Sequence, residues 1–183
     1  FDLILAAKAA RRMKIKPDYL VFRLNDLIRV SFTAATSSIN VLRLGGFTLI
    51  QDILSKFKYA RDPHIPRSAL LEQYQAQIAA SLTPAMSLNS HPEVLAKACT
   101  TAAAYVGSGI TDDINALSRV IRMLNSLLEN FSESENSKKG FSSPNLELTV
   151  NISILTAWAE LQNTSSTYKF LESVPGPYLN VLS

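Results

Sequence analysis

Apolar residues recur at helical spacing along most of this chain. The clearest stripe, spaced mainly at three and four positions, consists of Leu42, Gly46, Leu49, Ile50, Ile53, Leu54 and Phe57. Comparable stripes follow Leu20, Leu70, Pro92, Ile114 and Pro144. The alternation of apolar and polar residues that indicates strands is not convincing anywhere in the sequence. The pattern therefore predicts an all-α fold.

Residues that stop or start helices separate these stripes. Two prolines in the segment 61–66 exclude a helix there, and Ser68 is expected to cap the helix that follows. Pro92 suits the first turn of the next helix. Gly107 and Gly109 suit the end of that helix, because glycine readily adopts the left-handed conformation of a helix terminus.

The same pairing of helices recurs along the chain. First helices begin near Leu20, Leu70 and Ile114, and second helices near Val41, Val94 and Leu148. Both series step by about 50 residues, which is in the range of HEAT-type repeats. We therefore expect an α-solenoid, a right-handed stack of about three hairpins over 18–58, 68–109 and 112–163, forming one HEAT-repeat segment across residues 1–183.

Two features of the helices predict specific packing. The expected core residues are Leu49, Ile53, Leu71, Tyr74, Ile78, Ala98, Ala102, Leu117, Ile121, Ile154 and Trp158. The last helix is apolar on two sides, which predicts that it is buried on both faces. Its second apolar side consists of Leu148, Ile152, Leu155 and Ala159. Gly45 and Gly46 stand inside a helix at a cost of roughly 1 kcal/mol each relative to Ala, which predicts close approach of the partner helix.

The polar, Ser-rich stretch 132–143 is expected to be a flexible loop between the last two helices. Ser132 and Ser134 stand beside glutamates in this stretch and could accept a phosphate group there. An unmodified linker is the simpler interpretation, since Ser-rich composition is typical of linkers in general.

Charge adds one candidate interaction surface. The chain has 183 residues, 47% of them hydrophobic, and a formal net charge of +3. The positive charge gathers at the N-terminal end, where an electrostatic contact with an acidic partner or anionic lipid headgroups would use Lys8, Arg11, Arg12, Lys14 and Lys16. A solvated face, or a surface covered by a preceding repeat, is the alternative interpretation.

The cysteine count, the length of the apolar runs and the start of the chain support three further expectations. Cys99 is the single cysteine, which excludes an internal disulfide and fits a reducing compartment. No apolar run reaches the roughly 18 residues of a membrane-spanning helix. The chain begins at Phe1 without an initiating Met or a secretory signal. We expect it to be a fragment of a longer protein.

Candidate catalytic and metal-binding residues are few. His64, His91 and Cys99 would act as base, nucleophile or ligands only if the fold brought them together, and no CxxC or HExxH spacing supports this. Helix capping explains Asp112 and Asp113 better than cation binding does. We therefore expect no catalytic residue, no cofactor-binding residue and no metal site.

Four segments carry a more specific signal than the periodicity. They are DLIRVSFTAAT (26–36), LRLGGFTLIQDILSKF (42–57), LLEQYQAQIAASLTPAM (70–86) and PEVLAKACTTAAAYVGSGITDDINALSRV (92–120). These segments resemble the HEAT-repeat-containing protein 5 family, the large accessory proteins of the clathrin adaptor at the trans-Golgi network. The resemblance extends over Leu20–Gln162.

The resemblance implies a cytoplasmic, non-enzymatic scaffold without a cofactor. Its partners would be clathrin adaptor protein complex 1 and the accessory proteins of that complex. It would be peripheral at the trans-Golgi network, endosomes or clathrin-coated vesicles, reaching membranes through its partners, and no nucleic acid is expected. The alternative is a HEAT-repeat module for a transport cargo or nucleic acid, which basic residues on one concave surface would favour.

Overall fold

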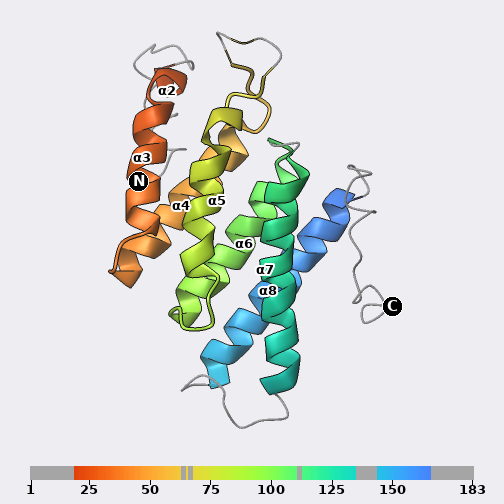
Figure 1. Cartoon of the computed structure of the whole chain (residues 1–183). Coiled ribbons are helices and arrows are strands. Elements are labelled where there is room, and N and C mark those ends of the chain that lie inside the picture. Colours follow the sequence, from red (N-terminus) through yellow and green to blue (C-terminus); the bar gives the residue numbers. More distant parts are fainter. Residues whose placement is uncertain (1–18, 63–64, 66–67, 111–112, 135–143, 166–183) are drawn as a thin grey trace.

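The protein is helical in a computed structural model that describes residues 19–62, 65, 68–110, 113–134 and 144–165 (Figure 1). The helices in these ranges are α2 (Tyr19–Phe22), α3 (Leu24–Ala35), α4 (Asn40–Phe57), the 3-10 turn η1 (Glu72–Tyr74), α5 (Gln75–Ala85), α6 (Pro92–Gly107), α7 (Ile114–Ser134) and α8 (Pro144–Ser165). The β-type pairing in these ranges is an isolated bridge between Arg61 and Ala69. The predicted all-α fold is confirmed.

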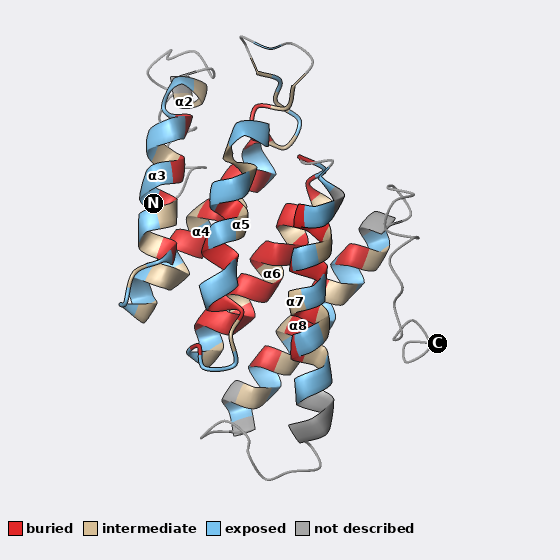
Figure 2. Ribbon diagram, viewed as in Figure 1, coloured by how far each residue is buried: buried red, intermediate tan, exposed pale blue. Residues whose placement is uncertain are grey.

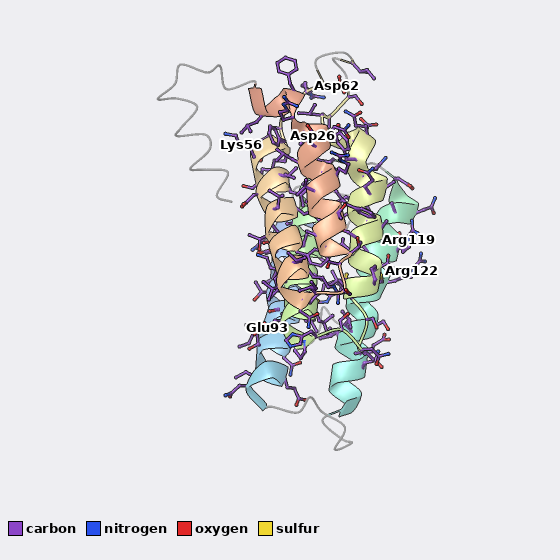
Figure 3. All side chains as sticks on the ribbon, turned by 90° about the vertical axis from the view of Figure 1, so that its left-hand side faces the viewer. Asp26, Lys56, Asp62, Glu93, Arg119 and Arg122 are labelled. Carbon is purple, nitrogen blue, oxygen red and sulfur yellow. The ribbon has the colours of Figure 1, made fainter. Side chains whose placement is uncertain are left out.

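The helices lie in two layers. Helices α3, α5 and α7 form one layer and α4, α6 and α8 form the other, as the two views in Figures 1 and 3 show. Each first helix runs antiparallel to the second helix that follows it, so α4, α6 and α8 run parallel to one another. This arrangement brings the C-terminal halves of α4, α6 and α8 to the same end of the stack.

Helix α6 is the centre of the core. Most of its residues are buried, including Val94, Leu95, Ala98, Cys99, Ala102 and Tyr105 (Figure 2). The helix packs against α4 on one side and α8 on the other, with α5 and α7 covering it from the first layer. Full burial of a Val or Leu side chain contributes about 1.5–3 kcal/mol, so α6 supplies a large share of the apolar burial.

The predicted core residues occupy this region. The buried ones are Ile53, Leu71, Ile78, Ala98, Ala102, Leu117, Ile121 and Ile154. Leu49, Tyr74 and Trp158 are partly buried and pack against the same cluster. The stripes therefore identified the core correctly, with three side chains at its edge.

The start of α5 differs from expectation. Ser68 does not cap a helix, because the chain first turns through η1 and α5 begins only at Gln75. The amide of Asp62 donates to the carbonyl of Ser68 at 3.0 Å, and the amide of Leu70 donates to the carbonyl of Ala60 at 2.9 Å. These bonds hold the connector in a short antiparallel pairing, which delays the helix. The Ser68 hydroxyl instead donates to the carboxylate of Glu72.

The expectation of a loop over 132–143 is corrected at its first three residues. Helix α7 continues to Ser134, so 132–134 are helical, and residues 135–143 lie outside the described part of the chain. The physical reason is that Ser and Glu each cost no more than about 0.7 kcal/mol relative to Ala inside a helix, so 132–134 contain no strong helix breaker.

Helix α8 is not buried on both faces. Val150, Ile154, Ala157 and Leu161 are buried, whereas Leu148, Ile152 and Leu155 are 58%, 53% and 49% exposed, and Ala159 is exposed. The physical reason is position: α8 packs against α6 and α7, and it is the last helix of its layer in the described residues. Its second apolar side therefore faces outward.

Candidate functional site

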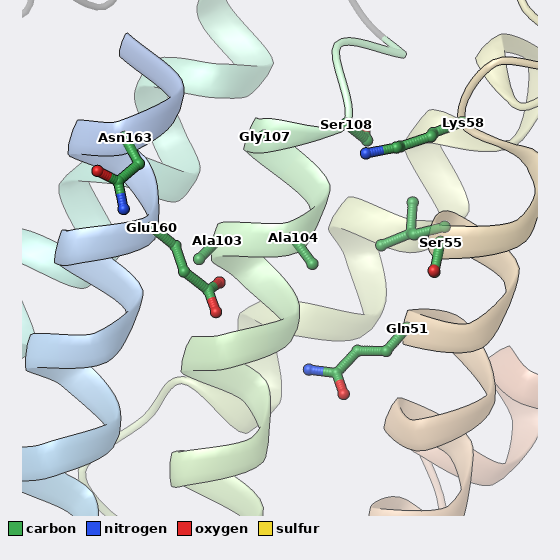
Figure 4. Close-up of a pocket in the computed structure, with 10 residues that line it drawn as sticks. Gln51, Ser55, Lys58, Ala103, Ala104, Gly107, Ser108, Glu160 and Asn163 are labelled. Carbon is green, nitrogen blue, oxygen red and sulfur yellow. The ribbon is translucent and has the colours of Figure 1, made fainter. Parts of the chain in front are cut away.

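A groove of about 350 Å³ opens between α4, α6 and α8 near their C-terminal ends (Figure 4). Helix α6 lies between the two walls and presents Ala103, Ala104 and Gly107 to the groove. Ala and Gly are the smallest residues, so the surface of α6 is recessed between α4 and α8, whose side chains here are longer. Alanine is the best helix former, which lets α6 carry this small-residue face at little cost to its helicity.

The walls of the groove carry polar side chains beside the apolar Leu54 of α4. Gln51, Ser55 and Lys58 come from α4 and its C-terminal end, and Glu160 and Asn163 come from α8. Figure 4 shows these two sets on opposite sides of α6, with Lys58 near Ser108 at the upper end of the groove and Gln51 at the lower end. A cation and a carboxylate thus stand on opposite walls.

Gln51 is fixed by a network that joins α4 to α6. Its Nε2 donates to Oγ1 of Thr100 at 2.9 Å, and its Oε1 accepts from Nζ of Lys97 at 2.5 Å. The Thr100 hydroxyl in turn donates to the carbonyl oxygen of Lys97 at 3.0 Å. All three side chains are partly buried. Lys97 therefore holds the Gln51 side chain, which lines the groove, without lining the groove itself.

Lys58 and Lys97 make no ion pair with a carboxylate in the described residues. The ion pairs found there join Asp26 to Arg23 and to Arg29 on α3. The ammonium group of Lys58 lies 4.6 Å from the ring centroid of Tyr59, a cation–π contact, and Lys97 bonds to the neutral amide of Gln51. Of these two lysines only Lys58 lines the groove, and the described partners of both are neutral.

The two chemical candidates that the structure describes, His91 and Cys99, are not brought together. Cys99 is fully buried inside α6, and burial raises the pKa of its thiol to about 12, far from the low pKa of a reactive cysteine. His91 precedes α6 and is exposed at the opposite end of that helix from the groove. His91 therefore does not form a site with Cys99. His64 lies outside the described residues.

Asp113 and Tyr105 are explained by their local structure. Asp113 accepts a hydrogen bond from the amide of Asn115 at 2.9 Å, as a helix-start residue does, and Asp112 lies outside the described residues. Burial, with a smaller contribution from Asp113, raises the pKa of Tyr105 to about 12. Among the described residues, no group of three or more His, Cys, Asp or Glu is placed to hold a metal ion.

Sequence reasoning singled out a different surface from this groove. Lys8, Arg11, Arg12, Lys14 and Lys16 lie outside the described residues, so their surface is still a prediction. The groove was missed, although the small residues TTAAAYVG at the end of α6 were a visible signal for it. No helix in the described residues is long and apolar enough to cross a bilayer.

The arrangement defines a class of protein: a stack of helical hairpins, an α-solenoid, with a polar groove along its second helices. The sequence model of the Laa1/Sip1/HEATR5 HEAT repeat region matches residues 19–183. The chain belongs to this family. The resemblance seen in the sequence is thereby confirmed.

Two curated relatives place the family in context. Protein SWEETIE of Arabidopsis thaliana is 35% identical over 134 residues, which cover 73% of this chain and 6% of the relative. AP-1 accessory protein LAA1 of Saccharomyces cerevisiae is 32% identical over 149 residues, which cover 79% of this chain and 7% of the relative. The chain thus spans less than a tenth of these relatives. No solved structure matches the chain.

Proposed function

We propose that this chain is part of a non-enzymatic protein-interaction scaffold that acts in clathrin-adaptor-dependent transport between the trans-Golgi network and endosomes. The observation that carries the proposal is the 32% identity to a protein named as an AP-1 accessory protein, which extends over 79% of this chain. The helical stack supports the proposal, because hairpin repeats bury their apolar residues between neighbouring repeats and leave extended surfaces on which partners can bind.

The proposed partners are clathrin adaptor protein complex 1 and its accessory proteins. Membrane association would be peripheral and would act through these partners, at trans-Golgi, endosomal or clathrin-coated vesicle membranes. The buried, high-pKa thiol of Cys99 and its distance along α6 from His91 support a binding role over nucleophilic chemistry. The basic set from Lys8 to Lys16 is proposed as a second, electrostatic contact.

A binding assay with purified components tests the proposal. The tagged chain is immobilised and incubated with purified adaptor protein complex 1, and retained adaptor is quantified against an unrelated helical-repeat protein. We expect specific retention. Binding of a nucleic-acid duplex with steep salt dependence, without adaptor retention, would favour the alternative of a nucleic-acid module. Retention no greater than on the unrelated protein would contradict the adaptor proposal.

A further inference from the structure

We propose that the outer side of α8 binds the second helix of a further hairpin of the same polypeptide, so that the stack continues beyond α8. This outer side consists of Leu148, Ile152, Leu155 and Ala159. Its exposure, its equivalence to covered positions on α4 and α6, and the length of the relatives support this occupant. The inference concerns the stacking of the helices and does not rest on the adaptor function.

The outer side of α8 is an exposed apolar stripe. Leu148, Ile152 and Leu155 are 58%, 53% and 49% exposed. They are spaced by four and three positions and Ala159 follows after four more, so all four residues lie on one side of the helix. Single exposed leucines are common on protein surfaces, whereas a contiguous apolar patch marks an interaction site. The stripe therefore requires a partner surface.

The spacing of the second helices shows what normally covers this side. Helices α4, α6 and α8 begin at residues 40, 92 and 144, so each begins 52 residues after the previous one. Gln51, Ala103 and Leu155 consequently occupy equivalent positions. The side chain of Gln51 reaches the next second helix, because it bonds to two residues of α6. Ala103 is 1% exposed and lies on the side of α6 that faces α8 (Figure 4).

This position thus faces the next second helix in both hairpins that have one. In α8 it is occupied by Leu155, and no further second helix is present among the described residues. Seven positions earlier, on the same side of each helix, Ala96 of α6 is 6% exposed and Leu148 of α8 is 58% exposed. The same side is therefore covered where a following helix exists and open where none is described.

The side chains define the chemistry of the missing helix. The outer side of α8 has no charged residue, so an uncharged, apolar stripe is its complement. Helix α6 presents Ala96 and Ala103 at the positions where α8 presents Leu148 and Leu155. The covering helix therefore carries small residues opposite these leucines or lies farther away, because the distance between packed helices depends on the side chains at the contact.

The length of the relatives favours a segment of the same polypeptide over a second copy. The matched region covers 6% of SWEETIE and 7% of LAA1, so in those proteins it lies within a much longer chain. A neighbouring hairpin in one polypeptide is held at a high effective concentration, which a separate molecule lacks. In stacks of repeats, each repeat contacts mainly its neighbours in sequence.

Photo-crosslinking in the full-length protein that contains this chain identifies the occupant. Leu155 is replaced by p-benzoylphenylalanine, the protein is irradiated, and the linked peptides are mapped by mass spectrometry. We expect an intramolecular link to a segment about 50 residues beyond α8, one repeat further along the chain. Leu88 is the matched control, because it is 46% exposed and lies between α5 and α6. The label at Leu88 should not capture that segment.

Links from position 155 to a second copy, to adaptor protein complex 1 or to a distant part of the chain would each overturn the inference. Absence of any link would do the same if the second measurement, on the unmodified protein, agrees. That measurement is hydroxyl-radical footprinting, which oxidises exposed side chains. In the isolated chain, Leu155 and Leu88 should be oxidised to a similar extent, since their exposed fractions are 49% and 46%.

In the full-length protein, oxidation of Leu155 should fall to the level of Ile154, which is 1% exposed, while oxidation of Leu88 should stay high. Equal oxidation of the two leucines in the full-length protein would overturn the inference. This comparison is made within one molecule, so it decides even if the isolated chain does not fold. Neither measurement requires adaptor binding, so failure of the adaptor function would leave both results standing.

Discussion

Gly46 and Ala35 meet backbone to backbone: a Cβ atom on Gly46 would lie 2.3 Å from the main-chain nitrogen of Ala35 and 2.8 Å from its Cα. Helices α3 and α4 therefore touch at this point with no side chain between them. The neighbouring Gly45 is different, because an added Cβ there would meet nothing within 4 Å. The close approach predicted for this glycine pair is confirmed at Gly46 and wrong at Gly45.

Gly46→Ala should destabilise the chain. The contact atoms belong to the backbone of α3, which cannot rotate away as a side chain would, so the helices must separate. We expect a loss of about 1–3 kcal/mol in the free energy of unfolding, the usual cost of overpacking, measured by urea denaturation. Gly45→Ala is the matched control and should gain up to about 1 kcal/mol from helix propensity. Equal shifts for both variants would contradict the assignment.

Stability should fall at alkaline pH because of Cys99. Burial raises the pKa of its thiol from 9.0 to about 12, so above pH 9 the unfolded chain loses this proton while the folded chain keeps it. The stabilisation is complete below the unfolded pKa and is lost as pH rises toward 12, with a slope of at most about 1.4 kcal/mol per pH unit.

Urea unfolding at pH 8, 9.5 and 10.5 measures this slope. Cys99→Ala removes the titrating group, so its stability should decline less steeply than that of the wild type over the same interval. Tyr105, with its pKa raised from 10.0 to about 12, is present in both proteins and cancels in the comparison. Parallel slopes for the two proteins would show that Cys99 does not titrate in this way.

The sequence predicted the fold well because helical stripes depend on local spacing. The apolar stripe that contains Ile53 and Leu54 is buried once another helix packs against it, and α6 is the helix that does so. The start of α5 was missed because it depends on hydrogen bonds between Ala60 and Leu70 across the connector, which no local pattern encodes. The groove was missed for a related reason: its walls come from helices far apart in sequence.

The two sides of α8 should respond differently to substitution. Ile154 is 1% exposed against the core, whereas Ile152 is 53% exposed. Ile154→Ala should cost about 2–5 kcal/mol of stability by leaving a cavity. Ile152→Ala should change stability by no more than about 0.5 kcal/mol, as expected at the surface. Thermal melts of both variants measure the difference, and a large loss for Ile152→Ala would show that its side of the helix is packed in solution.

The basic set near the N-terminus provides the last test of the scaffold function. Charge reversal of Arg11, Arg12 and Lys14 to Glu should weaken retention of adaptor protein complex 1, and the loss should be greatest at low salt, because salt screens charge contacts between exposed groups. The melting temperature should change little, since exposed charges contribute little to stability. Binding at several salt concentrations and a thermal melt measure the two effects. Unchanged retention with a lower melting temperature would instead assign these residues to a contact between repeats.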